Sequence, residues 1–522
     1  MKPLLVTLAT LVRGAERVDW PARAKAVRGA LKDSFRAYET YAGGFDDLAP
    51  VSGQGIDWLH ARATLVDALD SLYVVGLKED YDRAVRDVLK PTFFDPLSIG
   101  AGAPPFWESV SVFEYHIRVV GGLLGAFEVS GDRRLLHAAS YAADRVLSAL
   151  PRSKPWAASR NRQRLADPYA RPLLWLVARL VDEVQARWPG QHKDCISLAG
   201  VGSFGLELRM LSRETGEAKY REAADRVFRE LRDGWAADGG PGATKWLRGF
   251  YGRDCDFNHR LHARRGLVSG GDSFYEYLLK EQLVDEVPQP ARAAMYDWVE
   301  ARLQRMPLGD EHLALFASGM LALGATAPKR ARSAASTPRE QSLKRARALM
   351  EDPGRASYRT ATGLGGDTHS DPKYALRPEY VESLFYLYRT TGDEVYRDRG
   401  WAVFEALVTH CRVRGTGAFS GLKDVRRTAS DRIDQMESFW IAETLKYLYL
   451  LFSDRDLYPL DEWVFTTEAH LLATEPRCAR AACFGPERAQ WWRRLPLDAL
   501  LLAGVAALWI RARRRRRKER TV

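Results

Sequence analysis

One recurring pattern limits what this chain can fold into: an apolar helical segment, a tight turn with glycine, and a second helical segment. Four copies surround Gly76, Gly131, Gly216 and Gly392. Glycine suits a helix end because it adopts the left-handed backbone without a side-chain clash, and apolar residues at helical spacing flank each turn. Repeated antiparallel hairpins stack into a solenoid or close into a ring. The sequence therefore predicts an all-α fold with its helices in pairs.

The helical pattern runs from about residue 18 to residue 472 and predicts one large domain. The chain has 522 residues, of which 46% are hydrophobic, and this is enough for a core of that size. Two polar, basic stretches interrupt the pattern at residues 151–167 and 325–341. The second is rich in small residues and proline, so we expect it to be an exposed insertion in the domain.

The net charge of +11 lies mostly at one end of the chain. Residues 511–520 read RARRRRRKER, which is eight basic residues and one acidic residue, or +7. The rest of the chain is close to balanced and carries no nucleic-acid-binding motif, whereas a nucleic-acid-binding body needs a basic face of its own. We therefore expect no nucleic-acid partner.

The two ends of the chain hold the candidate targeting segments. Residues 1–17 contain a short apolar run that fits either a signal peptide or a leading helix. In the tail, residues 473–522, the run 495–510 is apolar except for Asp498 and is shorter than the ~20 residues of a usual membrane span. It fits a surface helix with a solvated basic tail, or a membrane anchor whose arginine-rich flank stays in the cytosol. We predict the anchor, with the body in the lumen.

The cysteines do not identify a compartment. There are five, an odd number that leaves at least one thiol unpaired, and none has metal-ligand spacing. They are Cys195, Cys255, Cys411, Cys478 and Cys483.

Several carboxylates lie in apolar helical segments, where a buried charge is costly unless it is paired or used. They are Glu114, Glu207, Asp272, Glu379, Glu382, Glu437 and Glu468. For any one of them a helix cap or a buried ion pair is the simpler interpretation, and Arg118 can share a helix face with Glu114. However, such an acid accompanies every hairpin, and a ring would bring the acids to one centre. Converging carboxylates, with few histidines, favour glycoside hydrolysis.

A family resemblance is carried by seven segments between about Phe45 and His470. In chain order they are FDDLAPVS, TLVDALDSLYVVGL, SVFEYHIRVVGGLLGAFEVSGD, GDSFYEYLLK, LRPEYVESLFYLYRTTGD, QMESFWIAETLKYLYLLFSD and VFTTEAH. In this order they resemble the class I α-mannosidases of glycoside hydrolase family 47. The resemblance implies an (α/α)7 barrel, bound Ca2+ and inverting hydrolysis of terminal α-1,2-linked mannose. It also implies high-mannose N-glycans of glycoproteins as substrates, in the lumen of the endoplasmic reticulum or Golgi.

The resemblance also implies roles for single residues. Glu114 resembles the general acid, Glu379 the general base, and Asp272 a third catalytic carboxylate that acts through water. Thr467 resembles the calcium ligand, and because calcium takes about six to eight oxygens, waters held by nearby acids would complete its shell. The positions that resemble water-holding or substrate-pocket residues are Arg118, Glu207, His312, Arg377, Glu382, Glu437 and Glu468.

The segments are divided between two branches of the family. Leu315 stands near where the processing enzymes carry a cysteine, and Thr466 replaces the usual asparagine before the calcium threonine. TTEAH and SGGDSFYEYLL resemble the branch of mannosidase-like proteins that enhance degradation, whereas SVFEYHIRVVGGLL resembles the processing branch. The preferred mannose stays open. A glycan-binding lectin without turnover and a non-catalytic helical scaffold are the alternatives, and the retained Glu114, Asp272 and Glu379 favour the enzyme.

Overall fold

The computed structural model describes residues 18–475 of the chain, with gaps. The gaps are 91–92, 94–110, 150–195, 238–239, 241–249, 252–269, 286–288, 306–307, 309–310, 329–330, 334–335, 352–357 and 369. The leading segment 1–17, the stretch 151–167, four of the five cysteines and the tail from residue 476, with the predicted anchor 495–510, lie outside the described residues. Across the described part of the chain, no helix has the length and apolar character that a membrane span needs.

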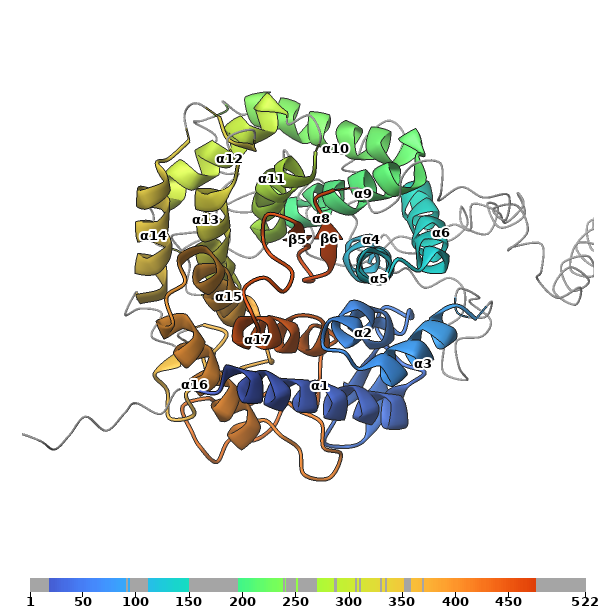
Figure 1. The fold of residues 1–522 in the computed structure, drawn as a ribbon, viewed down its shortest axis with the longest axis vertical. Helices are drawn as coiled ribbons and strands as arrows, with labels where there is room; N and C mark the ends of the chain where they lie inside the picture. Colours follow the sequence, from blue (N-terminus) through green and yellow to red (C-terminus); the bar gives the residue numbers. More distant parts are fainter. Residues whose placement is uncertain are drawn as a thin grey trace, which may run out of the picture.

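Seven helices form an inner ring within the described residues (Figure 1). They are α2 (Ala63–Val74), α5 (Gly121–Ser130), α9 (Gly205–Thr215), α11 (Asp272–Val284), α13 (Phe316–Thr326), α15 (Glu379–Thr391) and α17 (Leu445–Phe452). Each packs against the next along the chain, and α17 returns to α2 through the π-helix η9 (Trp440–Thr444). These helices are apolar on most sides because neighbours cover them all round; in α2, for example, all residues except Tyr73 are buried.

A second helix packs outside each inner helix. The outer helices are α3 (Lys78–Val88), α6 (Arg133–Ala149), α10 (Ala218–Ala237), α12 (Pro290–Leu303), α14 (Arg339–Glu351), α16 (Val395–His410) and α1 (Trp20–Ala42). The first six follow their inner partners in sequence, whereas α1 packs against α17 and closes the ring between the two ends of the described chain. Seven inner and seven outer helices confirm the predicted (α/α)7 barrel.

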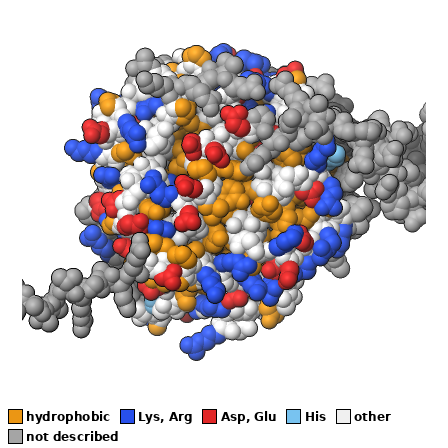
Figure 2. All heavy atoms as spheres, viewed as in Figure 1, with side chains coloured by type: hydrophobic (Ala, Val, Ile, Leu, Met, Phe, Trp, Pro, Cys, Tyr) orange, Lys and Arg blue, Asp and Glu red, His pale blue; other side chains and the backbone are white. Residues whose placement is uncertain are grey.

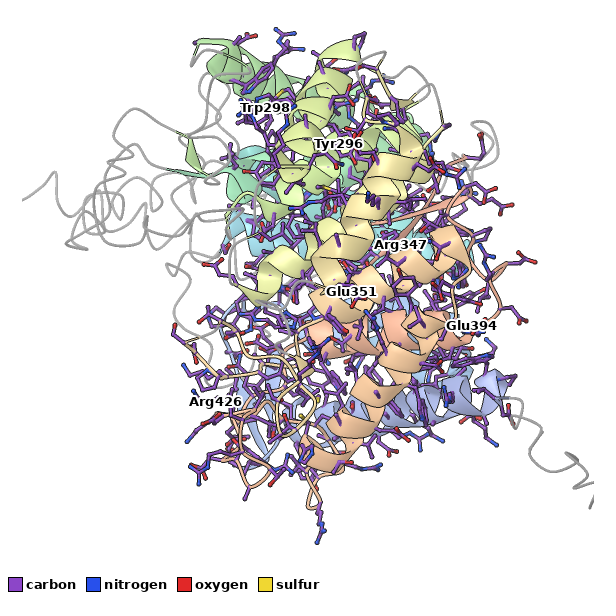
Figure 3. The ribbon with its side chains drawn as sticks, turned by 90° about the vertical axis from the view of Figure 1, so that its left-hand side faces the viewer. Tyr296, Trp298, Arg347, Glu351, Glu394 and Arg426 are labelled. Atoms are coloured by element: carbon purple, nitrogen blue, oxygen red, sulfur yellow. The ribbon has the colours of Figure 1, made fainter. Side chains whose placement is uncertain are left out.

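The outer helices bury one face and are joined to one another at the surface. Figure 3 shows α14 and α16 side by side on the outside of the barrel, and Arg399 of α16 pairs with Glu351 of α14 at 2.5 Å. On the face drawn in Figure 2, acidic and basic side chains are interspersed around a central apolar area.

The turns between paired helices agree with the sequence. Gly76, Gly131, Gly216 and Gly392 have φ values of 72°, 74°, 72° and 74°, which is the left-handed region that favours glycine. The backbone N–H groups of Gly131, Gly216 and Gly392 each return to a carbonyl four residues earlier and end the preceding helix. The four hairpins predicted from these glycines are confirmed.

Short elements complete the described structure. They are β1 (Asp47–Ala49), β2 (Gln54–Ile56), α4 (Val112–Glu114), the π-helix η2 (Tyr115–Val120), β3 (Ile196–Ser197), α8 (Leu198–Gly202), β4 (Phe250–Tyr251), the 3-10 helix η6 (His312–Leu315), β5 (Trp463–Phe465) and β6 (Leu471–Ala473). The strands pair antiparallel as β1–β2, β3–β4 and β5–β6. The β5–β6 hairpin lies inside the ring, where β5 contacts α11 and β6 contacts α5 (Figure 1).

Only part of the segment 325–341 is exposed. Ala331 is buried, and the hydroxyl of Ser336 donates to Asp297 of α12 at 2.7 Å. Arg332 lies 3.6 Å from the buried Glu300 of the same helix. The expectation of an exposed insertion was therefore wrong for residues 331, 332 and 336, because Ala331 is buried and the polar side chains of Arg332 and Ser336 contact α12.

Candidate active site

A cavity of about 290 Å3 lies between the inner helices, and carboxylates dominate its wall. We call the carboxylates that line it the acidic pocket: Glu114, Asp272, Glu276, Glu379, Glu382, Glu443 and Glu468. Arg118 and Arg377 are the arginines that line it, and an apolar part of the wall comes from Phe113, Ile117, Leu313, Phe316 and Phe439. Seven carboxyl groups and two arginines thus place more acids than cations around a small volume.

Helix starts deliver several of these acids. Asp272 is the first residue of α11 and Glu379 the first of α15, so each carboxylate lies where the unpaired N–H groups of a helix favour negative charge. Glu276 and Glu382 follow four and three residues later, which keeps each on the same helix face as the first acid. Glu114 ends α4, directly before a π-helix, and Glu443 lies in the second π-helix. Such irregular helical turns are frequent at functional sites.

Arg118 joins the two sides of the pocket. Its Nε donates to Glu114 at 3.0 Å, and its Nη1 donates to Glu468 at 2.9 Å, to Ser438 at 2.6 Å and to Asp67 at 3.2 Å. The guanidinium group is planar and has a fixed donor geometry, so these bonds fix the orientation of Glu114. The i, i+4 contact expected between Glu114 and Arg118 is confirmed.

Glu379 is held from behind by His312. Nδ1 of His312 lies 2.8 Å from Oε2 of Glu379, and Nε2 lies 2.9 Å from the hydroxyl of Tyr358. Burial raises the pKa of Glu379, but the hydrogen bond and charge of His312, together with nearby Arg377, lower it overall. Glu379 is therefore ionised at neutral pH and is suited to accept a proton.

The other acids outnumber the cations beside them, although Arg118 bonds Glu468 and the buried Lys280 pairs with Glu276. Burial, with help from Glu276 and Glu379, raises the pKa of Asp272 to about 7. Burial also raises the pKa of Glu468 to about 8, although Arg118 opposes the rise. The pKa of Glu382 and that of Glu443 are raised well above the ordinary range by burial and by neighbouring carboxylates. Such perturbed acids in a cavity are typical of functional sites.

The donor set fits a hard cation. Thr467 lines the cavity from the turn between β5 and β6, and its hydroxyl and carbonyl are oxygen donors beside crowded carboxylates. Hard divalent cations prefer oxygen ligands, and a cation would relieve the repulsion that raises the pKa values of the acids.

A second group of potential ligands lies elsewhere, around β2. Asp46, Asp57 and His60 bring ligand atoms within 4.8 Å of one another. However, Asp46 already accepts backbone N–H groups from Trp58, Leu59, His60, Ala61 and Ala63. Its oxygens therefore organise the loop before α2, and the acidic pocket suits a cation better.

The structure divides the residues that the sequence singled out. The cavity is lined by Glu114, Arg118, Asp272, Arg377, Glu379, Glu382, Thr467 and Glu468. His312 lies behind Glu379, and Glu207 is fully buried and bonded to His116 and Tyr277. Glu437 does not line the cavity. Burial raises its pKa overall, although Arg118 opposes the rise.

Two pocket acids were missed. Glu276 stands four residues after Asp272 in GDSFYEYLLK, so helical spacing from a candidate acid was the signal that could have found it. Glu443 lies in WIAETLKYLYLL, a more apolar segment than the one around Glu437. The apolar residues on both sides of Glu443 were the signal that could have marked it as a buried acid. Both line the cavity.

A ring of helical hairpins with carboxylates converging on a central cavity defines the class of glycosidases that attack sugars with acid and base side chains. The comparisons with known proteins give the family. The family model described as glycosyl hydrolase family 47 matches residues 30–307 and 299–474. The chain belongs to glycosyl hydrolase family 47, whose members are metal-dependent in general.

Named relatives cover most of the chain. It is 34% identical to mannosyl-oligosaccharide 1,2-alpha-mannosidase MNS1 of Arabidopsis thaliana, over 86% of this chain and 78% of that protein. It is 32% identical to the endoplasmic reticulum mannosyl-oligosaccharide 1,2-alpha-mannosidase of Schizosaccharomyces pombe, over 90% of this chain and 93% of that protein. An alpha-1,2-mannosidase from Trichoderma reesei has the same fold, with a TM-score of 0.68 at 23% identity, covering 87% of this chain and 99% of that one.

Proposed function

We propose that this chain removes terminal α-1,2-linked mannose from high-mannose N-glycans of glycoproteins, with inversion at the anomeric carbon. The observation that carries the proposal is the acidic pocket, in which Glu114, Asp272 and Glu379 line one cavity at the positions that resemble the catalytic acids of the family. The names of the relatives, which are 1,2-alpha-mannosidases, support this substrate.

In the proposed reaction, Glu379 takes a proton from a water molecule whose oxygen bonds to the anomeric carbon. The bond from that carbon to the glycosidic oxygen breaks, and the leaving oxygen takes a proton from Glu114. The lowered pKa of Glu379 suits the base. Arg118 holds Glu114 toward the cavity, and Asp272 acts on the leaving side through water.

We propose that the cation is Ca2+, held by the hydroxyl and carbonyl of Thr467. Calcium accepts a large, flexible shell of oxygen ligands, and waters bonded to Glu379, Glu382, Glu443 and Glu468 would fill it. When bound, the cation supplies positive charge that orients sugar hydroxyls and lowers the pKa of neighbouring carboxyls. Glu443 replaces Glu437 in this shell because Glu443 lines the cavity.

Mannose release tests the proposal against a lectin or a scaffold. The protein is incubated with a high-mannose N-glycan, with and without a chelator, and free mannose is quantified. The proposed enzyme releases mannose and stops when the metal is removed, whereas a lectin binds the glycan without release and a scaffold does neither. Proton NMR of the first-formed sugar should show β-mannose, and initial α-mannose would contradict inversion.

We propose the lumen of the endoplasmic reticulum or Golgi as the compartment, because two relatives, from Schizosaccharomyces pombe and Homo sapiens, are named as endoplasmic reticulum enzymes. Anchoring through residues 495–510 stays a prediction from the sequence. Protease treatment of sealed microsomes should remove an epitope at Val522 and spare the body. A protected C-terminus, or release by carbonate wash, would contradict it.

A further inference from the structure

Behind the cavity, three buried side chains form a hydrogen-bonded chain that ends on Thr467. They are His116 of η2, Glu207 of α9 and Tyr277 of α11, and each is 0% exposed. Nε2 of His116 lies 3.2 Å from Oε2 of Glu207, and the Tyr277 hydroxyl donates to Oε1 of Glu207 at 2.6 Å. The backbone N–H of Thr467 donates to the Tyr277 oxygen at 3.3 Å. None of the three lines the cavity.

The donor directions along this chain are fixed by its chemistry. The Tyr277 hydroxyl has a single proton, and it donates this proton to Oε1 of Glu207. That leaves the lone pairs of the Tyr277 oxygen facing the Thr467 N–H. His116 uses an N–H to hold the other oxygen of Glu207, which stops the carboxylate from rotating.

The turn that carries Thr467 is held from its other side as well. The backbone N–H groups of Glu468 and His470 donate to the Thr466 hydroxyl at 3.3 and 3.1 Å. Ala469 has a φ of 56°, an uncommon value for a residue with a side chain, and the buried Lys446 donates to its carbonyl at 2.7 Å. Residues on both sides of Thr467 are thus fixed, and Tyr277 is the side chain seen to bond the peptide N–H of Thr467 itself.

We propose that His116, Glu207 and Tyr277 are positioning residues that orient the Thr467 peptide, so that its hydroxyl and carbonyl oxygens face the cation. The proposal rests on the proposed cation site at Thr467. It gives Glu207 a role through Tyr277 instead of the substrate contact expected from the sequence. It also gives a role to His116, a residue that the sequence analysis did not single out.

The effect of breaking the chain falls on metal affinity. Tyr277→Phe keeps the ring in the core and removes the acceptor of the half-buried Thr467 N–H, so this peptide loses the bond that orients it. Loss of a residue that orients a metal ligand typically weakens metal binding about 10–100-fold. We expect Tyr277→Phe to raise the Kd for Ca2+ by that factor, while kcat at saturating Ca2+ stays near the wild-type value.

The test is calorimetric titration of metal-stripped protein with calcium chloride, followed by turnover at increasing calcium. Tyr220→Phe is the matched control, because Tyr220 is also fully buried and its hydroxyl bonds Ser140 and Asp144 on the outer layer. We expect it to leave the Kd for Ca2+ unchanged. His116→Gln keeps a donor for Glu207 and should bind Ca2+ more tightly than His116→Leu, a difference that a purely structural role would not produce.

The outcomes separate this proposal from the proposed function. Wild-type binding of Ca2+ by Tyr277→Phe would overturn the positioning role and leave the cation site standing. If the wild-type protein and Thr467→Ala bind Ca2+ alike, the cation site itself is wrong, and the positioning role falls with it. If Tyr277→Phe does not fold, Glu207→Gln replaces it. His116 and Tyr277 bond different oxygens of Glu207, and glutamine replaces one of these acceptors with an NH2 group that only donates. Unchanged affinity for Ca2+ in Glu207→Gln would also overturn the proposal.

Discussion

Two groups of buried acids share the helix α11 and behave in opposite ways. At its N-terminal end, Asp272 and Glu276 join the acidic pocket, where seven carboxylates face two arginines. At its C-terminal end, Glu281 and Asp285 meet Arg209 and Arg292 at distances of 2.7 to 3.2 Å. We call the second group, together with Asp225, the arginine cluster. Glu281 and Asp285 at one end are thus each paired with arginine, whereas at the other end Glu276 pairs with Lys280 and Asp272 lies among crowded carboxyl groups.

The difference separates acids that hold the barrel together from acids that are available for chemistry. In the arginine cluster, the single side chain of Arg209 contacts all three acids, Glu281, Asp285 and Asp225. It therefore connects α9 to α10 and α11. Burial raises the pKa of Asp225, but Arg209 lowers it overall, so the acid stays charged and paired. In the pocket, burial raises the pKa of Asp272 to about 7, because the backbone N–H of Ser273 offsets burial only in part and neighbouring acids add to the rise. Burial of an acid is therefore not by itself a sign of function, whereas an excess of acids over cations is.

The sharpest way to break this comparison is to remove one pocket acid. Glu114→Gln keeps the shape and one acceptor for Arg118 but removes the proposed proton donor. We expect kcat to fall by about 10^2–10^4-fold, the usual contribution of a positioned acid, with little change in glycan affinity or melting temperature. Steady-state kinetics, glycan binding and calorimetry measure the three quantities.

The control for this variant is Glu39→Gln, which changes a partly exposed acid that pairs with Arg83 at the surface. It should leave turnover unchanged. Near-wild-type turnover in Glu114→Gln would remove Glu114 from the role of acid.

The reverse experiment removes a cation from the arginine cluster. Arg209→Met leaves Glu281 and Asp285 with one arginine fewer in a dry interior, where breaking a buried ion pair costs about 3–5 kcal/mol. We expect a clear fall in melting temperature, with turnover per folded molecule retained, the opposite of Glu114→Gln. Arg134→Met is the matched control, because Arg134 and Asp132 form an ion pair at the surface, and such a pair stabilises a fold by at most about 1 kcal/mol. A variant that melts like the wild type would contradict the structural role of the cluster.

Metal removal sharpens the comparison from the ligand side. A cation bound only by the folded protein stabilises it by about 2.7 kcal/mol when its concentration is a hundredfold above its Kd. Chelation should therefore abolish activity and lower the melting temperature, and Thr467→Val should respond to calcium less than the wild type. Arg209→Met should keep the calcium response. Full activity of metal-stripped protein would refute the cation's role.

The fold could be anticipated from local signals because helix ends and glycine turns are local properties. The glycine-centred hairpins predicted pairs of helices, and the family resemblance supplied the number seven. The ring closes where α1 packs against α17, which joins the two ends of the described chain. A local sequence pattern cannot predict this contact, because the two helices are far apart in the sequence. The packing of residues 331–336 on α12 was likewise missed, since basic, small-residue segments usually lie exposed.

The site was harder to predict than the fold because inner helices are buried on all sides. Helical spacing shows that Glu207 is internal, but not whether it faces the cavity or a neighbouring helix, and here it faces His116 and Tyr277. Glu437 and Glu443 lie six residues apart, and the π-helix over 440–444 changes the direction in which the second acid points. Which of two nearby acids enters a cavity depends on such packing details.

The smallest expected effect is a difference in how the two groups respond to pH in metal-free protein. The pKa of Asp272 is raised to about 7 in the fold, so between about pH 4 and pH 7 the folded state holds more protons than the unfolded state. This contribution to stability is full below about pH 4 and is lost as the pH rises through 7. Asp225 has a lowered pKa, so its contribution to stability is lost only as the pH falls below the ordinary range of an aspartate.

Metal-free Asp272→Asn should therefore show a shallower fall in melting temperature between pH 5 and pH 7.5 than the wild type. We expect a difference on the order of 1 kcal/mol, or roughly 2–4 °C, reduced by partial contact with water. Asp225→Asn should leave this slope unchanged, because Asp225 is ionised in both states throughout that window. Saturating calcium should flatten the wild-type slope, since a cation favours the charged carboxylates. An equal slope in metal-free wild type and Asp272→Asn would mean that the crowding at the N-terminal end of α11 is relieved by protein groups, and the contrast between the two ends of the helix would then fail at Asp272.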